Sequence, residues 1–117
     1  MSETTLNEYS FIAEFETTAE QVHDTAKSKG WWESDRCDGE LIALAHSELS
    51  EMLEALRHMN PPSEHIPEFS GAEEEAADVV IRLMDMSQRR GWRLAEAIVA
   101  KMRFNAGREY KHGGKLF

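Results

Sequence analysis

Two pairs of carboxylates with the same spacing are the residues of this sequence best suited to chemistry. Glu48 and Glu51 are three residues apart, and so are Glu75 and Asp78 further along the chain. Side chains at i and i+3 of a helix are neighbours, so the two carboxylates of each pair can reach one metal centre. Carboxylate oxygens suit Mg²⁺ or Mn²⁺, which makes these pairs candidate ligands for a divalent cation.

Both pairs occupy the same rotational position beside an apolar stripe. At about 100° per residue, Glu48 falls on the edge of one stripe and Glu51 lies about 60° further round, while Glu75 and Asp78 repeat this offset beside a second stripe. The first stripe contains Leu41, Ile42, Ala45, Leu49, Met52, Leu53 and Leu56, and the second contains Ala76, Val79, Val80, Leu83 and Met86. If the two helices pack antiparallel with these stripes facing, four carboxylates line one groove. Such a cluster needs a counter-charge, because like charges in a partly dry site cannot all remain ionised.

The alternative is that these acids simply face solvent. Glutamates three residues apart are common on acidic helices, and the matched second pair is what favours a metal site over a solvated face. Glu73 and Glu74 we interpret as cap and dipole residues, because acids are favourable at the start of a helix. A non-enzymatic, acidic helical interaction module therefore remains an open interpretation.

Four helices are predicted, and no segment shows the sustained two-residue alternation of a strand. The first runs from about Thr17 or Thr18 to Lys29, the second from about Asp38 to Met59, the third from behind Ser70 to Gly91, and the fourth from about Trp92 to Arg108. Residues 1–15 are left as an N-terminal arm and residues 109–117 as a non-helical tail. The prediction is a single all-α domain over residues 1–117, built as a small four-helix bundle with up-and-down neighbours.

Composition and charge exclude several classes of protein. The chain has 117 residues and a formal net charge of -9, so it lacks the basic surface that nucleic-acid binding requires. An anionic substrate would need a positive charge between itself and the protein, and a bound cation can supply it. Cys37 is the only cysteine, no segment resembles a signal peptide, and no apolar run approaches a membrane span. We therefore expect a cytoplasmic protein that binds neither nucleic acid nor membrane.

The motifs "HSELSEMLEALR" and "EEEAADVVIRLMD" resemble the E-x-x-E and E-x-x-D signature of the all-α nucleoside triphosphate pyrophosphohydrolases, the MazG-like proteins. The likeness extends from "KSKGWW" to "KMRFNAGREYKHGGK" and so covers most of the chain. The resemblance implies hydrolysis of a nucleoside triphosphate to the monophosphate and pyrophosphate, with Mg²⁺ held by Glu48, Glu51, Glu75 and Asp78. It also implies a homodimer or homotetramer with composite sites. A phosphoribosyl-ATP pyrophosphatase-type enzyme, which shares the fold, is the related alternative.

The resemblance and the chemistry together suggest roles for the two acids of the first pair. A metal ion can neutralise triphosphate oxygens and activate water, and a carboxylate less tied to the metal can accept the proton of that water. Either Glu48 or Glu51 suits this catalytic role, and the sequence does not separate them.

Basic residues near the C-terminus form a candidate phosphate clamp. Lys101, Asn105 and Arg108 have i, i+4, i+7 spacing and share one helical face, and Lys115 follows in the tail. The alternative for Arg108 is that a cation near a helix C-terminus offsets the dipole. Lys101 and Asn105 match the C-terminal K-x-x-x-N element of the family.

Trp31 and Trp32 are candidate contacts for the nucleobase. Adjacent indoles cannot easily both be buried, so we expect one to pack into the bundle while the other lines a cleft and stacks on a base. The alternative is that both are core or interface aromatics.

Overall fold

The protein is all-α, as its sequence predicts. The computed structural model describes residues 3–108, and within that range it contains four helices and no strand. The helices are α1 (Leu6–Ser28), α2 (Asp38–Arg57), α3 (Gly71–Arg90) and α4 (Leu94–Ala106). None of these helices combines the length and the apolar character needed to cross a membrane.

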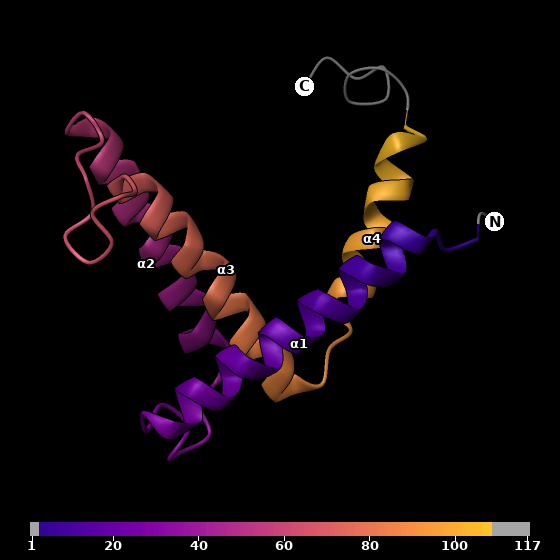
Figure 1. The fold of residues 1–117 in the computed structure, drawn as a ribbon. Helices are drawn as coiled ribbons and strands as arrows, with labels where there is room; N and C mark the ends of the chain where they lie inside the picture. Colours follow the sequence, from indigo (N-terminus) through magenta and orange to yellow (C-terminus); the bar gives the residue numbers. More distant parts are fainter. Residues whose placement is uncertain (1–2, 109–117) are drawn as a thin grey trace.

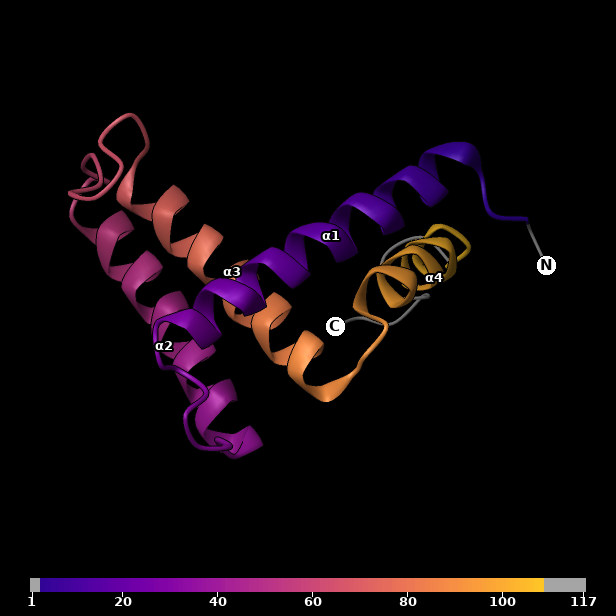
Figure 2. The same cartoon turned by 60° about the horizontal axis from the view of Figure 1, so that its bottom comes forward.

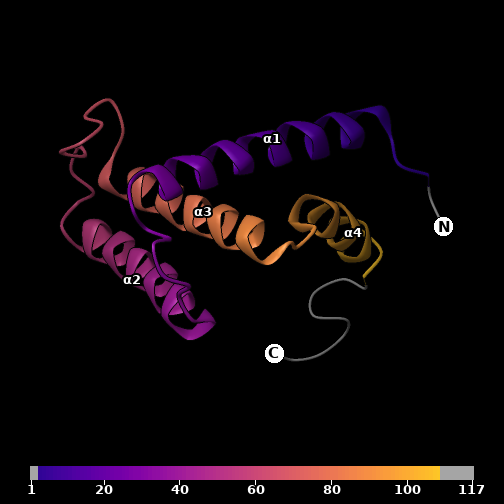
Figure 3. The ribbon, with the colours of Figure 1, turned by 90° about the horizontal axis from the view of Figure 1, so that it is seen from below.

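The four helices form an open V (Figure 1). One arm is the antiparallel pair of α2 and α3, and the other arm is α4 packed along the N-terminal half of α1. The C-terminal half of α1 packs on α3, so α1 joins the two arms, which the turned views also show (Figures 2 and 3). The C-terminal part of α4 therefore lies in the arm away from the α2–α3 pair.

Helix α1 begins much earlier than the sequence patterns predicted. Its N-cap is Thr5, whose hydroxyl accepts a hydrogen bond from the Glu8 amide at 3.1 Å while the Glu8 carboxylate accepts from the Thr5 amide at 2.7 Å. The predicted start at Thr17 or Thr18 is wrong, since both residues lie within the helix, and residues 6–15 of the predicted arm are helical.

A partner on α4 stabilises this early start. The guanidinium of Arg103 lies 2.7 Å from the Glu8 carboxylate and, with the capping bonds, lowers the pKa of Glu8 to about 2. A carboxylate in the first turn also interacts favourably with the helix dipole.

The ends of α2 and α3 follow from turn and cap chemistry close to the predicted positions. Helix α2 ends at Arg57, because Met59 and Asn60 adopt left-handed backbone with φ of 65° and 51°. Helix α3 has the predicted capping box between Ser70 and Glu73, and it ends at Gly91, which takes φ of 73°. Glycine accepts that conformation without steric cost, whereas the Cβ atoms of Met59 and Asn60 make it less favourable there.

Helix α4 is shorter than predicted. It begins at Leu94 rather than Trp92 and ends at Ala106 rather than Arg108. Trp92 belongs to the turn that Gly91 begins, and its amide donates to the Ser87 carbonyl at 2.9 Å.

The hydrophobic core is small and lies where the two arms meet. Trp32, Leu41 and Met86 are buried against one another, with Ala26 of α1 packed beside them. The apolar stripes of α2 and α3 are only partly covered, and several of their large side chains are 43–54% exposed. These side chains are Ile42, Leu49, Leu53, Leu56, Val80 and Leu83.

The Ser70 cap gives a direct test of how α3 is held. Replacing Ser70 by Ala is expected to lower the free energy of unfolding by about 1 kcal/mol, because an amide at the start of α3 loses its acceptor. Urea denaturation followed by circular dichroism measures this change. Ser50→Ala, at an exposed position within α2, is the matched control and should have no comparable effect. Equal stabilities for the Ser70 variant and the wild type would contradict this account of the cap.

Candidate metal centre

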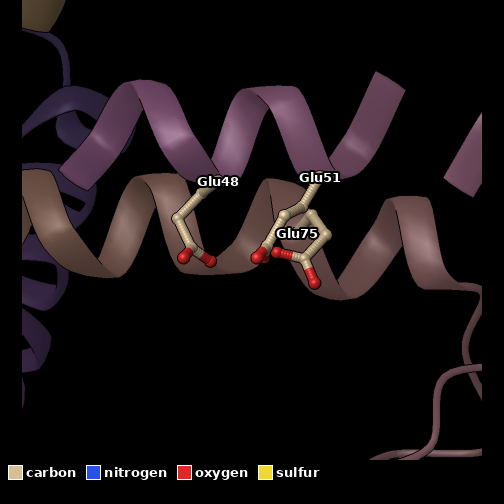
Figure 4. A group of neighbouring side chains, drawn as sticks. All are labelled: Glu48, Glu51 and Glu75. Atoms are coloured by element: carbon tan, nitrogen blue, oxygen red, sulfur yellow. The ribbon is translucent and has the colours of Figure 1, made fainter. Parts of the chain in front are cut away.

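The antiparallel packing of α2 and α3 brings the predicted acids into one groove. Carboxylate oxygens of Glu48 and Glu51 on α2 and of Glu75 on α3 all lie within 4.8 Å of one another. Figure 4 shows the three side chains extending from the two helices toward the same space. The predicted antiparallel arrangement with matched rotational offsets is therefore what the fold contains.

Asp78 extends the cluster one turn further along α3. One of its carboxylate oxygens lies within 4.8 Å of oxygens of Glu74 and Glu75, and the neighbouring Glu48 raises its pKa. We call Glu48, Glu51, Glu75 and Asp78 the four-acid cluster.

Glu74 has a different role, although it borders the cluster. Its carboxylate accepts hydrogen bonds from the buried Ser63 hydroxyl and from His65 Nδ1 at 2.7 Å. The Ser63 hydroxyl in turn accepts from the amides of His65 and Ile66 at 3.1 and 3.0 Å. Glu74 thus ties the loop between α2 and α3 to the start of α3, a role that the cap-and-dipole interpretation did not include.

Proton binding relieves part of the repulsion within the cluster. Burial raises the pKa of Glu75, and so do its hydrogen bonds with Glu51 and Glu48 and the negative charges of these two residues. Together these effects bring the pKa of Glu75 to about 8. Burial and the neighbouring Glu48 likewise raise the pKa of Asp78 to about 6, against a smaller opposing effect of Arg82. At neutral pH the cluster therefore holds a proton, mainly on Glu75, that a cation can displace.

The donor set fits a hard divalent cation. All four side chains offer oxygen, and the Oε2 atom of Glu75 is buried without a hydrogen-bond partner within residues 3–108. A buried acceptor that lacks a donor is costly, and a cation would satisfy it. Mg²⁺ and Mn²⁺ prefer this combination of ligands.

Glu48 and Glu51 differ in their surroundings. Glu48 is buried, with 8% of its surface exposed, and its Oε1 atom lies 3.5 Å from the Nη2 atom of Arg82. Glu51 is exposed. The sequence analysis did not single out Arg82, although its position four residues after Asp78 places it on the same face of α3.

A cavity of about 280 Å³ adjoins the cluster and combines aromatic, cationic and acidic walls. Glu48, Asp78 and Arg82 lie at the boundary that it shares with the cluster. The remaining polar and aromatic lining comes from Thr25, Lys29, Trp31, Arg36 and Asp85. The sequence did not mark three of these residues, Lys29, Arg36 and Asp85, as part of the site, because only the fold brings them beside the acids.

The two adjacent indoles differ in burial, as the sequence predicts. Trp32 is buried at 8% exposure, whereas Trp31 is 55% exposed and lines the cavity. The Trp32 indole N–H donates to Asp85 at 2.9 Å, and His23 Nδ1 lies 2.6 Å from the same carboxylate. The guanidinium of Arg36 lies over both indole rings at 5.6 and 5.7 Å, which holds the cavity wall in place.

The predicted phosphate clamp does not join the cluster within one chain. Lys101 and Asn105 are exposed on α4, in the other arm of the V, and neither lines the cavity (Figure 1). Lys101 and Arg108 instead lie over the ring of Phe104 at 4.5 and 5.7 Å. Lys115 lies outside the described residues.

Comparison of the chain with family models, with curated proteins and with solved structures finds no match.

The raised pKa values predict that stability falls as pH rises. Between its ordinary value of 4.5 and about 8, Glu75 holds a proton in the folded chain but not in the unfolded chain. Unfolding then releases a proton, so the free energy of unfolding decreases across this window. The melting temperature of the metal-free protein, measured by circular dichroism from acid to alkaline pH, should fall accordingly.

Glu75→Gln removes the titrating group and should flatten the upper part of this profile. Glu54→Gln changes an exposed acid of α2 outside the cluster and is the matched control. If the wild-type melting temperature did not change between neutral and alkaline pH, the proposed sharing of protons in the cluster would be wrong.

Proposed function

We propose that this protein is a Mg²⁺-dependent pyrophosphohydrolase that converts a nucleoside or deoxynucleoside triphosphate to the monophosphate and pyrophosphate. The observation that carries the proposal is the four-acid cluster at the edge of a cavity with an exposed indole and cationic side chains. The motif resemblance to MazG-like proteins supports the same reaction. A solvated acidic face accounts poorly for the burial of Glu48.

Glu48, Glu51, Glu75 and Asp78 would hold the cation. When bound, Mg²⁺ neutralises phosphate oxygens and activates water for attack on phosphorus. The reaction breaks the anhydride bond between the α- and β-phosphates, so pyrophosphate leaves and water supplies the new oxygen of the monophosphate. The carboxylates of the cluster would position the cation beside the α-phosphate, and one of them would accept the proton of the attacking water.

Glu51 is the better candidate for the proton acceptor. It is exposed, whereas Glu48 is buried and already faces Arg82. An exposed carboxylate can both approach the attacking water and pass the proton on to solvent.

The cavity can receive the nucleoside. Trp31 offers a ring face for stacking on a base, and every base has such a face. Lys29 and Arg36 also line the cavity and offer positive charge to an anionic substrate in a protein of net charge -9.

A homo-oligomer would complete the site. The half-exposed apolar side chains of α2 and α3 form a face that a second copy can cover. In a symmetric assembly, α4 of one copy could bring Lys101 and Asn105 to the cluster of the other. This arrangement would reconcile the predicted clamp with its distance from the acids within one chain.

A panel of ribo- and deoxynucleoside triphosphates with Mg²⁺ tests the activity. We expect release of pyrophosphate rather than orthophosphate, measured by a coupled pyrophosphate assay. Glu48→Gln and Asp78→Asn should each reduce turnover by about a hundredfold or more, because each removes a ligand of the metal. Glu54→Gln should retain activity. Orthophosphate as the only product, or full activity in both cluster variants, would contradict the proposal.

Mixing two inactive variants tests the composite site. Glu48→Gln and Asn105→Ala should each be impaired, and a co-refolded mixture should regain activity, because one mixed site combines intact acids with an intact α4. A site built within one chain would regain none. Light scattering that detects only the 13.4 kDa species in the active protein would also contradict the composite site.

A further inference from the structure

Arg82 is in direct contact with the four-acid cluster through Glu48. Within residues 3–108, no other lysine or arginine forms an ion pair with any of the four acids. Arg82 also lines the adjoining cavity, so it stands at the boundary between the cluster and the space proposed for the nucleotide.

The guanidinium of Arg82 is poorly satisfied where it lies. Its contact with Glu48 is long, at 3.5 Å, and its Nε atom is buried without a hydrogen-bond partner within residues 3–108. A guanidinium carries five N–H donors in a planar fork, so a single long contact to Glu48 leaves other donors of Arg82 available to a ligand. The side chain is 32% exposed, which leaves room for it to change partners.

Two ligands would act on Arg82 in opposite ways. A divalent cation beside Glu48 repels the guanidinium and competes for the same carboxylate. A triphosphate beside the cation offers oxygens whose geometry matches the guanidinium fork.

We propose that Arg82 exchanges partners during the catalytic cycle, pairing with Glu48 in the metal-free protein and with a phosphate oxygen once cation and substrate are bound. Arg82 thereby holds the empty cluster together and becomes a substrate-binding residue in the loaded site. The phosphate half of this inference rests on the proposed function, whereas the competition with the cation does not.

A purely structural arginine would behave differently. If Arg82 only stabilised the fold, its removal would weaken the binding of cation and phosphate alike. Partner exchange predicts effects of opposite sign, because Arg82 opposes the cation and favours the phosphate.

Calorimetric titration of Arg82→Gln, Arg82→Lys and the wild type separates these cases. Mg²⁺ alone is titrated first at about pH 9, above the pKa of Glu75, so that protons do not compete for the carboxylates. Inorganic tripolyphosphate is then titrated with Mg²⁺ in excess, which probes phosphate binding without assuming a base. Arg57→Gln removes the same charge at an exposed position of α2, where the arginine pairs with Glu54, and is the matched control.

Arg82→Gln is expected to bind Mg²⁺ about threefold more tightly and tripolyphosphate about tenfold more weakly than the wild type. Arg82→Lys keeps the charge without the planar fork, so it should bind tripolyphosphate more tightly than Arg82→Gln but more weakly than the wild type. Arg57→Gln should change neither affinity appreciably. Melting temperatures confirm that each variant is folded. If Arg82→Gln is not, the weaker tripolyphosphate binding expected of Arg82→Lys carries the test.

Unchanged or weaker Mg²⁺ binding by Arg82→Gln would overturn the exchange of partners. If Arg82→Gln bound Mg²⁺ more tightly but tripolyphosphate with unchanged affinity, Arg82 would be only a counter-ion for Glu48. The proposed pairing of Arg82 with a phosphate oxygen would then be wrong. If the wild type binds both ligands but hydrolyses no nucleotide, the proposed function fails while the competition between Arg82 and the cation stands.

Discussion

Repulsion among four carboxylates in one partly buried groove is the constraint on which the rest of the structure depends. Helices α2 and α3 place Glu48, Glu51, Glu75 and Asp78 together, and these groups cannot all be ionised there without compensation. Raised pKa values of Glu75 and Asp78 and the guanidinium facing Glu48 provide partial compensation. A divalent cation would replace both kinds of compensation at once, which is the physical reason for proposing metal binding in this groove.

Contacts at both ends of α3 hold the four carboxylates in place despite their mutual repulsion. The Ser70 cap and the bonds from Ser63 and His65 to Glu74 fix the start of α3, so that Glu75 enters the groove at a defined position. At the other end of α3, Arg90 bonds to Asp38 at 2.7 Å and to the Arg36 carbonyl at 2.6 Å. These contacts attach the loop that carries the two indoles, and the cavity wall is thereby built beside the acids.

The sequence predicted those features that local chemistry determines. Helical periodicity placed both acid pairs correctly, and Ser70 and Gly91 marked the ends of α3 because their cap chemistry is local. The sequence-based prediction was wrong where contacts between residues far apart in the chain determine the structure. Thr5-x-x-Glu8 and Thr17-x-x-Glu20 are equivalent capping patterns, and α1 extends to the earlier one because Arg103 on α4 pairs with Glu8. No local pattern marked Arg82 as part of the site, and the position of α4 away from the acids depends on packing that periodicity does not encode.

The central claim is that the four carboxylates hold one functional divalent centre. Anomalous diffraction at the manganese edge, from crystals grown with Mn²⁺ at neutral to alkaline pH, tests it most directly. The account predicts an anomalous peak within coordination distance of carboxylate oxygens from both α2 and α3. Anomalous peaks only at other sites, with the four carboxylates free of metal, would contradict it.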